Sequence, residues 1–222
     1  KGLRFTPTNS GIYPTRSEDY YDKDGFKYKK DVEKAKKLLD EAGLKDVDGD
    51  GLREDKNGNK LTFNFAIRNT GAEYDQALAD VFVKSWKEVG LDVKRVDGKL
   101  MAPKDWSQRV QGDDPGIDIF QGAWGLGTDP NASSLVGKST PLNYQRYTTE
   151  EIQKSLDAMG SSDMFDDKKL VEAYQKFDKQ FREEAAWLPF SWQQSMTWVN
   201  KRVKTLDLAK LKTGEQKVYG LE

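Results

Sequence analysis

The feature that most constrains the fold is an apolar pattern that alternates, becomes helical and then alternates again. Lys60–Ile67 (KLTFNFAI) places apolar residues at every second position, which is the period of a β-strand. Ala72–Val89 repeats its apolar residues at helical spacing, and Gly90 ends that pattern before Leu91–Val96 alternates again. Such a strand, helix and strand predict a right-handed crossover between parallel strands, and therefore an α/β fold.

Further elements are expected on both sides of this unit. A helix over Val32–Ala42 is expected, capped by Asp31 and stopped by Gly43, and a second over Met101–Val110, with Trp106 and Val110 facing inward. A strand from Ile117 is expected to join the same sheet. Two more helices follow, one from Thr148 to Met159 that opens on a Thr148–Glu151 capping box and one over Asp167–Glu184, and then extended segments over Trp187–Phe190 and Trp192–Val199.

Composition excludes several classes of protein. The chain has no cysteine and no histidine, which rules out thiol catalysis, disulfides and any triad that uses imidazole as its base. With 36 Lys and Arg against 37 Asp and Glu, the formal net charge is -1, so no field is expected to hold nucleic acid. The first crossover lacks the G-x-G-x-x-G pattern of dinucleotide sites, and no cofactor is expected.

Ile117–Leu135 (IDIFQGAWGLGTDPNASSL) carries the strongest functional signal. The glycines around Trp124 remove side chains, so another backbone can approach closely. The stretch then closes on turn-forming residues that include one carboxylate, Asp129. An open strand edge, an aromatic side chain and a lone anion suit an extended ligand with a positively charged end. The same residues also fit a strand and a loop whose aspartate only caps a turn.

Two other segments allow more than one interpretation. Pro141–Tyr147 (PLNYQRY) has no period and either lines a cleft or covers the end of the sheet. Asp46–Gly51 (DVDGDG) has the opening of a calcium loop, with alternating carboxylates from Asp46, Asp48 and Asp50. The twelfth position is Asn57 instead of the bidentate glutamate, and Glu54 and Asp55 are out of register. The sequence therefore favours a tight polar turn over a metal site.

The order of several stretches resembles the extracellular solute-binding proteins that serve peptide ABC importers, the oligopeptide-binding family. The stretches span about Asp31 to Lys204; they are VEKAKKLLDEAGLKDVDGDG, ALADVFVKSWKEVGLDVK, DIFQGAWGLGTDPNASSL with NYQRY, and WLPFSWQQSMTWVNKRVK.

The resemblance implies a receptor of two lobes that closes over an extended oligopeptide and delivers it to a membrane permease. It implies a cell-surface lipoprotein or a periplasmic protein, a monomer, and no catalytic activity. This chain would supply the carboxy-terminal, periplasmic-binding-protein-like lobe, with a mixed, mostly parallel sheet flanked by helices. Residues 1–30 are then an irregular lead-in, 31–204 the ligand-binding lobe, and 205–222 an irregular tail, with the first lobe and the export signal outside this sequence.

The resemblance also implies which residues bind the ligand. In the family the peptide lies as an added strand against both lobes, and an aspartate after the tryptophan-bearing strand receives its α-ammonium group. Carried onto this sequence, the strand segment is Gln121–Gly125 and the aspartate is Asp129, although GLGT makes the spacing from Trp124 longer than in enterobacterial members. The predicted ligand-binding residues are Gly122, Ala123, Trp124, Gly125, Thr128, Asp129, Asn143 and Tyr144.

Residue chemistry alone leaves two alternative functions open. With 6 Trp and 9 Tyr, the chain has aromatic side chains on which sugars stack, so a glycosidase that uses two carboxylates is one of them. It would require two carboxylates in one pocket with perturbed pKa values. A calcium-binding surface module is the other, and it depends only on Asp46, Asp48 and Asp50.

Overall fold

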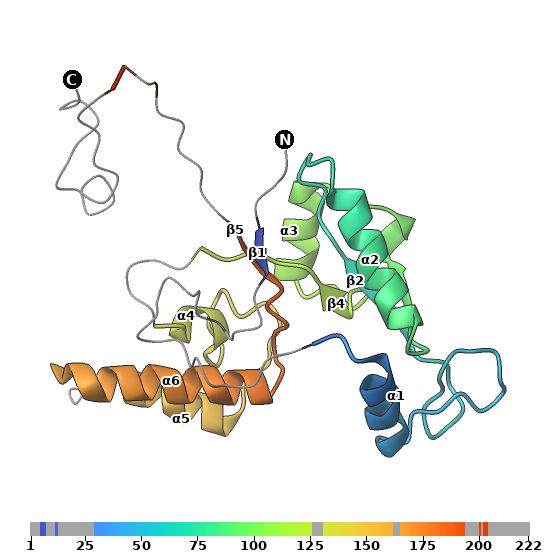
Figure 1. Cartoon of the computed structure of the whole chain (residues 1–222), viewed down its shortest axis with the longest axis horizontal. Coiled ribbons are helices and arrows are strands. Elements are labelled where there is room, and N and C mark those ends of the chain that lie inside the picture. The colour runs from blue at the N-terminus through green and yellow to red at the C-terminus, as the bar shows by residue number, and fades with distance from the viewer. Residues whose placement is uncertain are drawn as a thin grey trace. The chain divides into compact units, whose positions relative to one another are not determined.

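We describe the fold from a computed structural model, which describes residues 5–7, 12, 29–125, 131–161, 165–193, 200 and 202–203 (Figure 1). The chain divides into two units, one of Lys1–Thr8 with Phe190–Glu222 and one of Asn9–Pro189. Each unit is treated by itself. The domain boundaries expected after residues 30 and 204 stay a prediction.

The larger unit contains a three-stranded parallel sheet. Its strands are β2 (Thr62–Ala66), β3 (Asp92–Arg95) and β4 (Ile119–Phe120), in the order β3-β2-β4. Both neighbours run parallel to β2. The crossover predicted from the changing period is therefore confirmed, and the strand predicted from Ile117 joins the same sheet.

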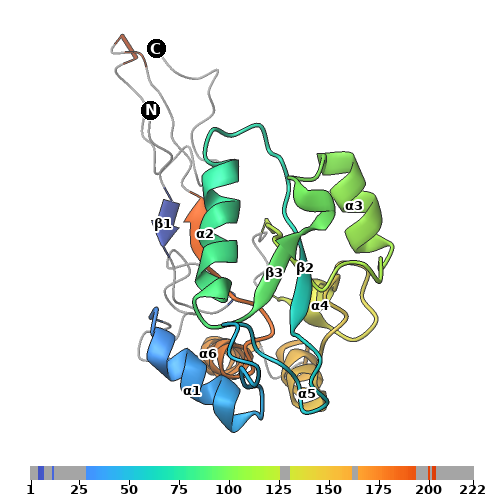
Figure 2. The same ribbon diagram turned by 90° about the vertical axis from the view of Figure 1, so that its right-hand side faces the viewer.

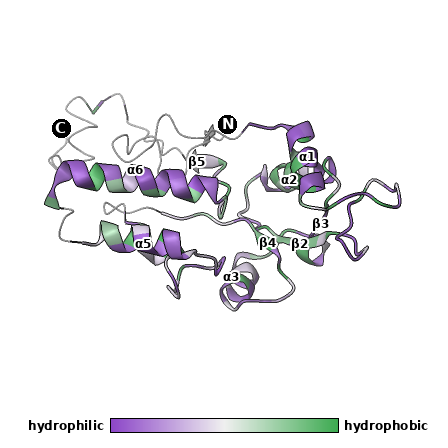
Figure 3. Cartoon of the chain, turned by 90° about the horizontal axis from the view of Figure 1, so that it is seen from below, coloured by the Kyte–Doolittle hydropathy of each residue, from purple (hydrophilic) through white to green (hydrophobic). Residues whose placement is uncertain are grey.

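Helices cover both faces of this sheet (Figures 2 and 3). Helix α2 (Asp75–Lys87) makes the crossover from β2 to β3, and α3 (Pro103–Gln111) follows the 3-10 turn η1 (Val96–Gly98). Because side chains alternate along a strand, the side chains of β2 pack on both faces of the sheet. One face holds Phe63, Phe65 and Ile67 with α2, and the other holds Ala66 with Trp106 and Val110 of α3.

The helical spacing predicts one apolar stripe on α2, formed by Tyr74, Ala77, Leu78, Val81, Phe82 and Val89, and the structure agrees with it only in part. Leu78 and Phe82 pack on the sheet, but Ala77 and Val81 are exposed, Val81 by 61%. The residues that pack on the sheet include Ala79, Phe82 and Trp86, and Phe65 meets the rings of Phe82 and Trp86 edge-on at 5.8 and 5.1 Å. Apolar residues surround much of this helix, so the aromatic side chains decide which face is buried.

A second apolar cluster is built from the short helix α4 (Ser133–Val136) and the pair α5 (Glu150–Met159) and α6 (Asp167–Glu183). The pair is antiparallel, since Ser155 Oγ lies 2.8 Å from Gln180 Oε1 and Thr149 Oγ1 lies 3.1 Å from Glu184 Oε1. Figure 3 shows α5 and α6 side by side.

The start of α5 is one residue later than predicted. Thr149, not Thr148, is the N-cap, and its hydroxyl accepts a hydrogen bond from the Ile152 amide at 3.1 Å. This register places Ile152 at the third helical position, so the predicted Thr148–Glu151 capping box is wrong. The two adjacent threonines are equivalent as caps, and only packing decides between them.

Helix α1 (Val32–Glu41) begins as predicted, with the Asp31 side chain accepting from the Lys34 amide at 2.9 Å. Arg53, which is only 7% exposed, connects this helix to the sheet layer. Its guanidinium donates to Asp40 Oδ1 at 2.6 Å and to the carbonyl of Val89 at 2.7 Å. A buried cation with several acceptors of this kind fixes the position of the loop before β2.

Gly90 is expected to be essential for this arrangement. Its φ is +87°, and an added Cβ would lie 2.8 Å from Cγ of Arg53. Gly58 has a similar φ of +82° but nothing within 4 Å. We expect Gly58→Ala to cost about 1–2 kcal/mol of unfolding free energy from backbone strain, and Gly90→Ala to cost roughly 1–3 kcal/mol more from the clash. Urea unfolding of the two variants measures the difference; equal losses would mean that Arg53 moves aside freely.

The smaller unit contains one described sheet, in which β1 (Phe5–Pro7) pairs antiparallel with β5 (Ser191–Gln193). The backbone register joins Thr6 to Trp192. The extended segment expected over Trp192–Val199 is described only to Gln193. In the described parts of both units, no helix has the length and apolar character that crossing a membrane requires.

Candidate functional site

Strand β4 lies at one edge of the described sheet. It pairs with β2 on one side, and the Gln121 amide extends that pairing by donating to the Ala66 carbonyl at 2.9 Å. Beyond this bond, no backbone-to-backbone hydrogen bond joins Gly122–Gly125 to another described residue. Ala123 and Gly125 are exposed. With respect to the described residues, the main chain that follows β4 is therefore available to an additional hydrogen-bonding partner.

Trp124 is half-buried within a group of aromatic rings. Its ring centroid lies 4.9 Å from that of Tyr144 and 6.1 Å from that of Trp187, with which it stacks at 19°. Trp187 in turn meets Phe181 of α6 edge-on at 5.6 Å. Each such pair contributes about 0.5–1.5 kcal/mol beyond area burial. The indole is thus held in a fixed orientation beside the open main chain.

The two described glycines of the segment leave space for a second backbone. An added Cβ at Gly125 would have nothing within 4 Å, and at Gly122 its nearest neighbour would be Phe120 Cε2 at an ordinary 3.5 Å. Neither glycine has a positive φ. Their contribution here is the absence of a side chain over the exposed edge, and not an unusual backbone conformation.

The segment Pro141–Tyr147 packs against this site. Arg146, at φ +52°, donates to the Gln111 carbonyl at 2.9 Å and pairs with Asp113 Oδ1 at 3.1 Å. These bonds tie the segment to the end of α3 and place Tyr144 against Trp124. The sequence left open whether this segment lines a cleft or covers the end of the sheet. Through Tyr144, the segment reaches the proposed ligand edge.

Asn143 has a different environment from the other predicted site residues. It is only 7% exposed, and its Nδ2 donates to the carbonyls of Gly137 at 2.9 Å and Tyr147 at 3.3 Å. Its Oδ1 is buried and has no hydrogen-bond partner among the described residues. The donating side of this amide therefore maintains the loop that carries Tyr144, and only its oxygen is available to accept a further hydrogen bond.

The turn before β4 is fixed by an ion pair. Arg109 Nε lies 2.5 Å from Asp114 Oδ2, and Asp114 Oδ1 accepts from the Gly116 amide at 2.8 Å. The hydrogen bond from the guanidinium, followed by the one from Gly116, holds the pKa of Asp114 below its ordinary value of 3.8. This carboxylate stays ionised and directs the chain into the edge strand.

Two buried donors without partners lie at the carboxyl end of β2. The guanidinium carbon of Arg68 lies 4.6 Å from the ring centroid of Trp106, and neither Arg68 Nε nor Trp106 Nε1 has a hydrogen-bond partner among the described residues. Trp106 also contacts Phe120 of the edge strand, at 6.0 Å between centroids. Ligands of α/β sheets bind at the carboxyl ends of the strands. Arg68 was missed in the sequence, although it directly follows a predicted strand.

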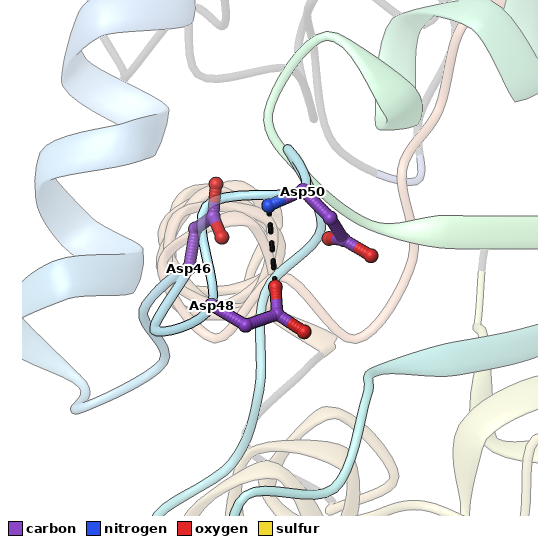
Figure 4. Close-up of side chains that lie close together, drawn as sticks. All are labelled: Asp46, Asp48 and Asp50. Atoms are coloured by element: carbon purple, nitrogen blue, oxygen red, sulfur yellow. Dashed lines mark hydrogen bonds between the residues drawn. The ribbon is translucent and has the colours of Figure 1, made fainter.

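The structure brings together five of the predicted ligand-binding residues: Gly122, Ala123, Trp124, Gly125 and Tyr144. Asn143 lies in the loop that supports them. Thr128 and Asp129 lie outside the described residues. The acidic residues of the possible metal loop, Asp46, Asp48 and Asp50, form a separate group (Figure 4).

Comparison with known proteins identifies the family. The model for bacterial extracellular solute-binding proteins, family 5 Middle, matches residues 2–146. The chain belongs to this family. It is 32% identical over 213 residues to the oligopeptide-binding protein OppA of Lactococcus lactis subsp. cremoris (strain SK11), which covers 94% of this chain and 35% of the relative. It is 32% identical over 158 residues to the oligopeptide-binding protein AppA of Bacillus subtilis (strain 168), covering 68% of this chain and 28% of that protein.

Solved structures of relatives have the same fold. Lactococcal OppA, complexed with an endogenous peptide in the closed conformation, matches with a TM-score of 0.82 at 30% identity, over 93% of this chain and 38% of that one. AppA from Bacillus subtilis, in complex with a nonapeptide, matches with a TM-score of 0.68 at 25% identity, over 84% and 36%. The predicted periplasmic-binding-protein-like α/β fold is confirmed. The chain spans about a third of the length of these relatives.

The family is one of bacterial extracellular solute-binding proteins, and the relatives that match are oligopeptide-binding proteins. The resemblance found in the sequence is therefore confirmed at the level of family and fold.

Proposed function

We propose that this chain forms one lobe of the substrate-binding component of an ABC importer, and that the complete protein captures extended oligopeptides between two lobes. The observation that carries the proposal is the main chain of Gly122–Gly125, which has no backbone hydrogen bond to another described residue and lies beside the fixed ring of Trp124. The similarity to oligopeptide-binding proteins from two organisms supports the same ligand class.

The peptide binds by adding a strand to the open edge. Main-chain hydrogen bonds supply affinity whatever the side chains are, and each contributes about 0.5–1.5 kcal/mol net. Trp124 and Tyr144 offer a rigid aromatic surface against which one residue of the peptide packs.

Asp129, with Thr128 beside it, receives the amino end of the peptide in this proposal. An ammonium group about 4 Å from a carboxylate gains about 1 kcal/mol in water and about 4 kcal/mol at the effective dielectric constant near a protein surface. Closure of the two lobes removes water from the pair. The same contact is therefore stronger in the closed state and favours closure.

We further propose that the complete protein is a monomer that is held at the cell surface or in the periplasm, transfers its peptide to a membrane permease and has no catalytic activity, cofactor or nucleic-acid partner. Hydrogen bonds from a cation or an amide hold the pKa of five described carboxylates below its ordinary value; they are Asp50, Asp55, Glu88, Asp92 and Asp114. A glycosidase acid requires a raised pKa.

Calorimetry on the complete two-lobed protein tests the proposal. Mixed-sequence peptides of several lengths are titrated against it, with a linear hexasaccharide as the control ligand. We expect peptides to bind at micromolar concentration or below, which corresponds to about -8 kcal/mol, and the sugar not to bind. The isolated 222-residue chain should bind the same peptides far more weakly, because half of the enclosing surface is missing. Binding of the sugar alone would overturn the proposal.

A further inference from the structure

Arg68, which follows β2, has no ion pair with any carboxylate among the described residues. The other described arginines of the larger unit each form one; they are Arg53, Arg95, Arg109, Arg146 and Arg182. The Arg68 side chain is half-buried, and its Nε is buried with no hydrogen-bond partner in the described part of the chain. A guanidinium keeps its charge and offers donors only, so an anion is the partner that best compensates for it.

Trp106 of α3 holds this guanidinium. The guanidinium carbon of Arg68 lies 4.6 Å from the ring centroid of Trp106, which is a cation–π contact. Trp106 is only 5% exposed, and its Nε1 is buried and also lacks a hydrogen-bond partner among the described residues. An indole N–H is likewise a donor only. The pair therefore offers a charged fork and a neutral donor, and a carboxylate has enough lone pairs to accept from both.

The register of the sheet places Arg68 beside the open main chain. Strands β2 and β4 pair Ala66 with Phe120, and the Gln121 amide continues this pairing by donating to the Ala66 carbonyl. Two residues further along, the same parallel register sets Arg68 opposite Gly122. Since side chains alternate along a strand, Arg68 lies on the face of Ala66, which is the face that α3 covers.

Gly122 leaves this face uncovered between Arg68 and the edge. It has no side chain, whereas the residue two positions earlier on the same strand, Phe120, packs with Trp106. Tyr144 packs against the same cluster and also contacts Trp124, so the Arg68 subsite and the aromatic surface are continuous. A guest strand along Gly122–Gly125 would lie two strand spacings from β2, about 9–10 Å. The extended side chains of an arginine and an acidic residue together span that distance.

We propose that Arg68 is a specificity-determining residue that binds an acidic side chain of the guest peptide. This inference rests on the proposed peptide function and adds a side-chain preference to the same site. The guanidinium donates two parallel hydrogen bonds to a glutamate or aspartate carboxylate, and the Trp106 N–H is a further donor to that group. The ammonium expected at Asp129 and the carboxylate at Arg68 then fix the guest strand at two points.

Calorimetry on the complete two-lobed protein tests this preference. The parent peptide has no acidic residue, a free amino end and an amidated carboxyl end, and its variants carry Glu or Gln at one position at a time. We expect one position at which Glu binds at least about tenfold more tightly than Gln, which corresponds to about 1.4 kcal/mol. Arg68→Met should abolish this preference and leave the affinity for the parent peptide unchanged. Arg68→Lys should retain only part of it, because an ammonium lacks the fork.

Arg95→Met is the matched control. Arg95 belongs to β3, at the other edge of the described sheet, and it pairs with Asp80 at 3.5 Å. Its loss should leave the preference for Glu over Gln unchanged. Trp106→Phe keeps a ring under the guanidinium but removes the indole N–H, so it should reduce the preference without abolishing it. Arg68→Gln replaces Arg68→Met if circular dichroism shows the latter to be unfolded.

Two results would overturn this inference alone. One is equal affinity for the Glu and Gln peptides at every position while the parent peptide still binds. The other is a preference for Glu that persists at full size in a folded Arg68→Met protein. If no peptide binds, the parent included, the proposed peptide function fails, and this inference fails with it.

Discussion

Replacing Asp129 with alanine in the two-lobed protein is expected to weaken the binding of peptides with a free amino end by about 30-fold or more. Removing one partner of a desolvated charge pair costs about 2–5 kcal/mol, much of it from leaving the peptide ammonium without a counter-charge. Each 1.4 kcal/mol corresponds to about tenfold in affinity. Calorimetric titration with one peptide, in the wild-type and variant proteins, measures this loss directly.

The same peptide with an acetylated amino end provides the control ligand. It has no ammonium group, so its affinity should change little between wild type and Asp129→Ala. Asp157→Ala, which removes an exposed carboxylate of α5, is the control variant and should leave both peptides unaffected. An equal loss for free and acetylated peptides would show that Asp129 maintains its loop and does not bind the amino end.

Replacing Arg182 with methionine is expected to destabilise the chain by about 3–5 kcal/mol. Arg182 is 1% exposed, and its Nε lies 3.3 Å from Oδ2 of Asp178, which is fully buried. Asp178 also accepts a hydrogen bond from the Ile12 amide at 3.0 Å. Without the guanidinium, the carboxylate inside the α5–α6 cluster loses this buried ion pair. Urea unfolding followed by far-ultraviolet circular dichroism measures the change.

Two further variants separate the loss of packing from the loss of charge. Lys179→Met changes an exposed cation of the same helix and should alter the unfolding free energy by less than about 0.5 kcal/mol. The double variant Asp178→Leu with Arg182→Met removes both charges, and should recover a large part of the loss. A single Arg182→Met variant as stable as wild type would contradict a stabilising role for this buried ion pair.

The apolar periods predicted the sheet and its crossovers because those patterns depend on neighbouring residues alone. The alternation of Phe63, Phe65 and Ile67 and the inward positions of Trp106 and Val110 were sufficient to place β2 and α3. The buried face of α2 was predicted only in part, because several sides of the helix are apolar: Leu78 and Phe82 pack on the sheet, but Ala77 and Val81 do not. The cap of α5 was wrong for a similar reason, since two threonines compete for one position.

The sequence did not predict which charged residues are buried. Arg53, Glu54, Asp178 and Arg182 are buried, yet composition and period place such residues on the surface. Distant parts of the chain supply partners for two of them: Arg53 contacts Asp40 and Val89, and Asp178 accepts from the Ile12 amide. The same holds at the site, where Trp124 was identified from its glycines but its contact with Tyr144 depends on the loop that Arg146 anchors.

The central position of β2 also determines how firmly each neighbour is attached. The loop closed between Phe65 and Ile119 is nearly twice as long as the one between Thr62 and Asp92, so its closure entropy is about 0.5 kcal/mol less favourable, and β4 contributes only two paired residues. The pairing of β4 with β2 is thus the weaker of the two strand pairings in this sheet, and we expect local unfolding to begin there. A guest strand hydrogen-bonded along Gly122–Gly125 would stabilise the pairing of β4 with β2, so that peptide binding and the stability of this pairing are thermodynamically coupled.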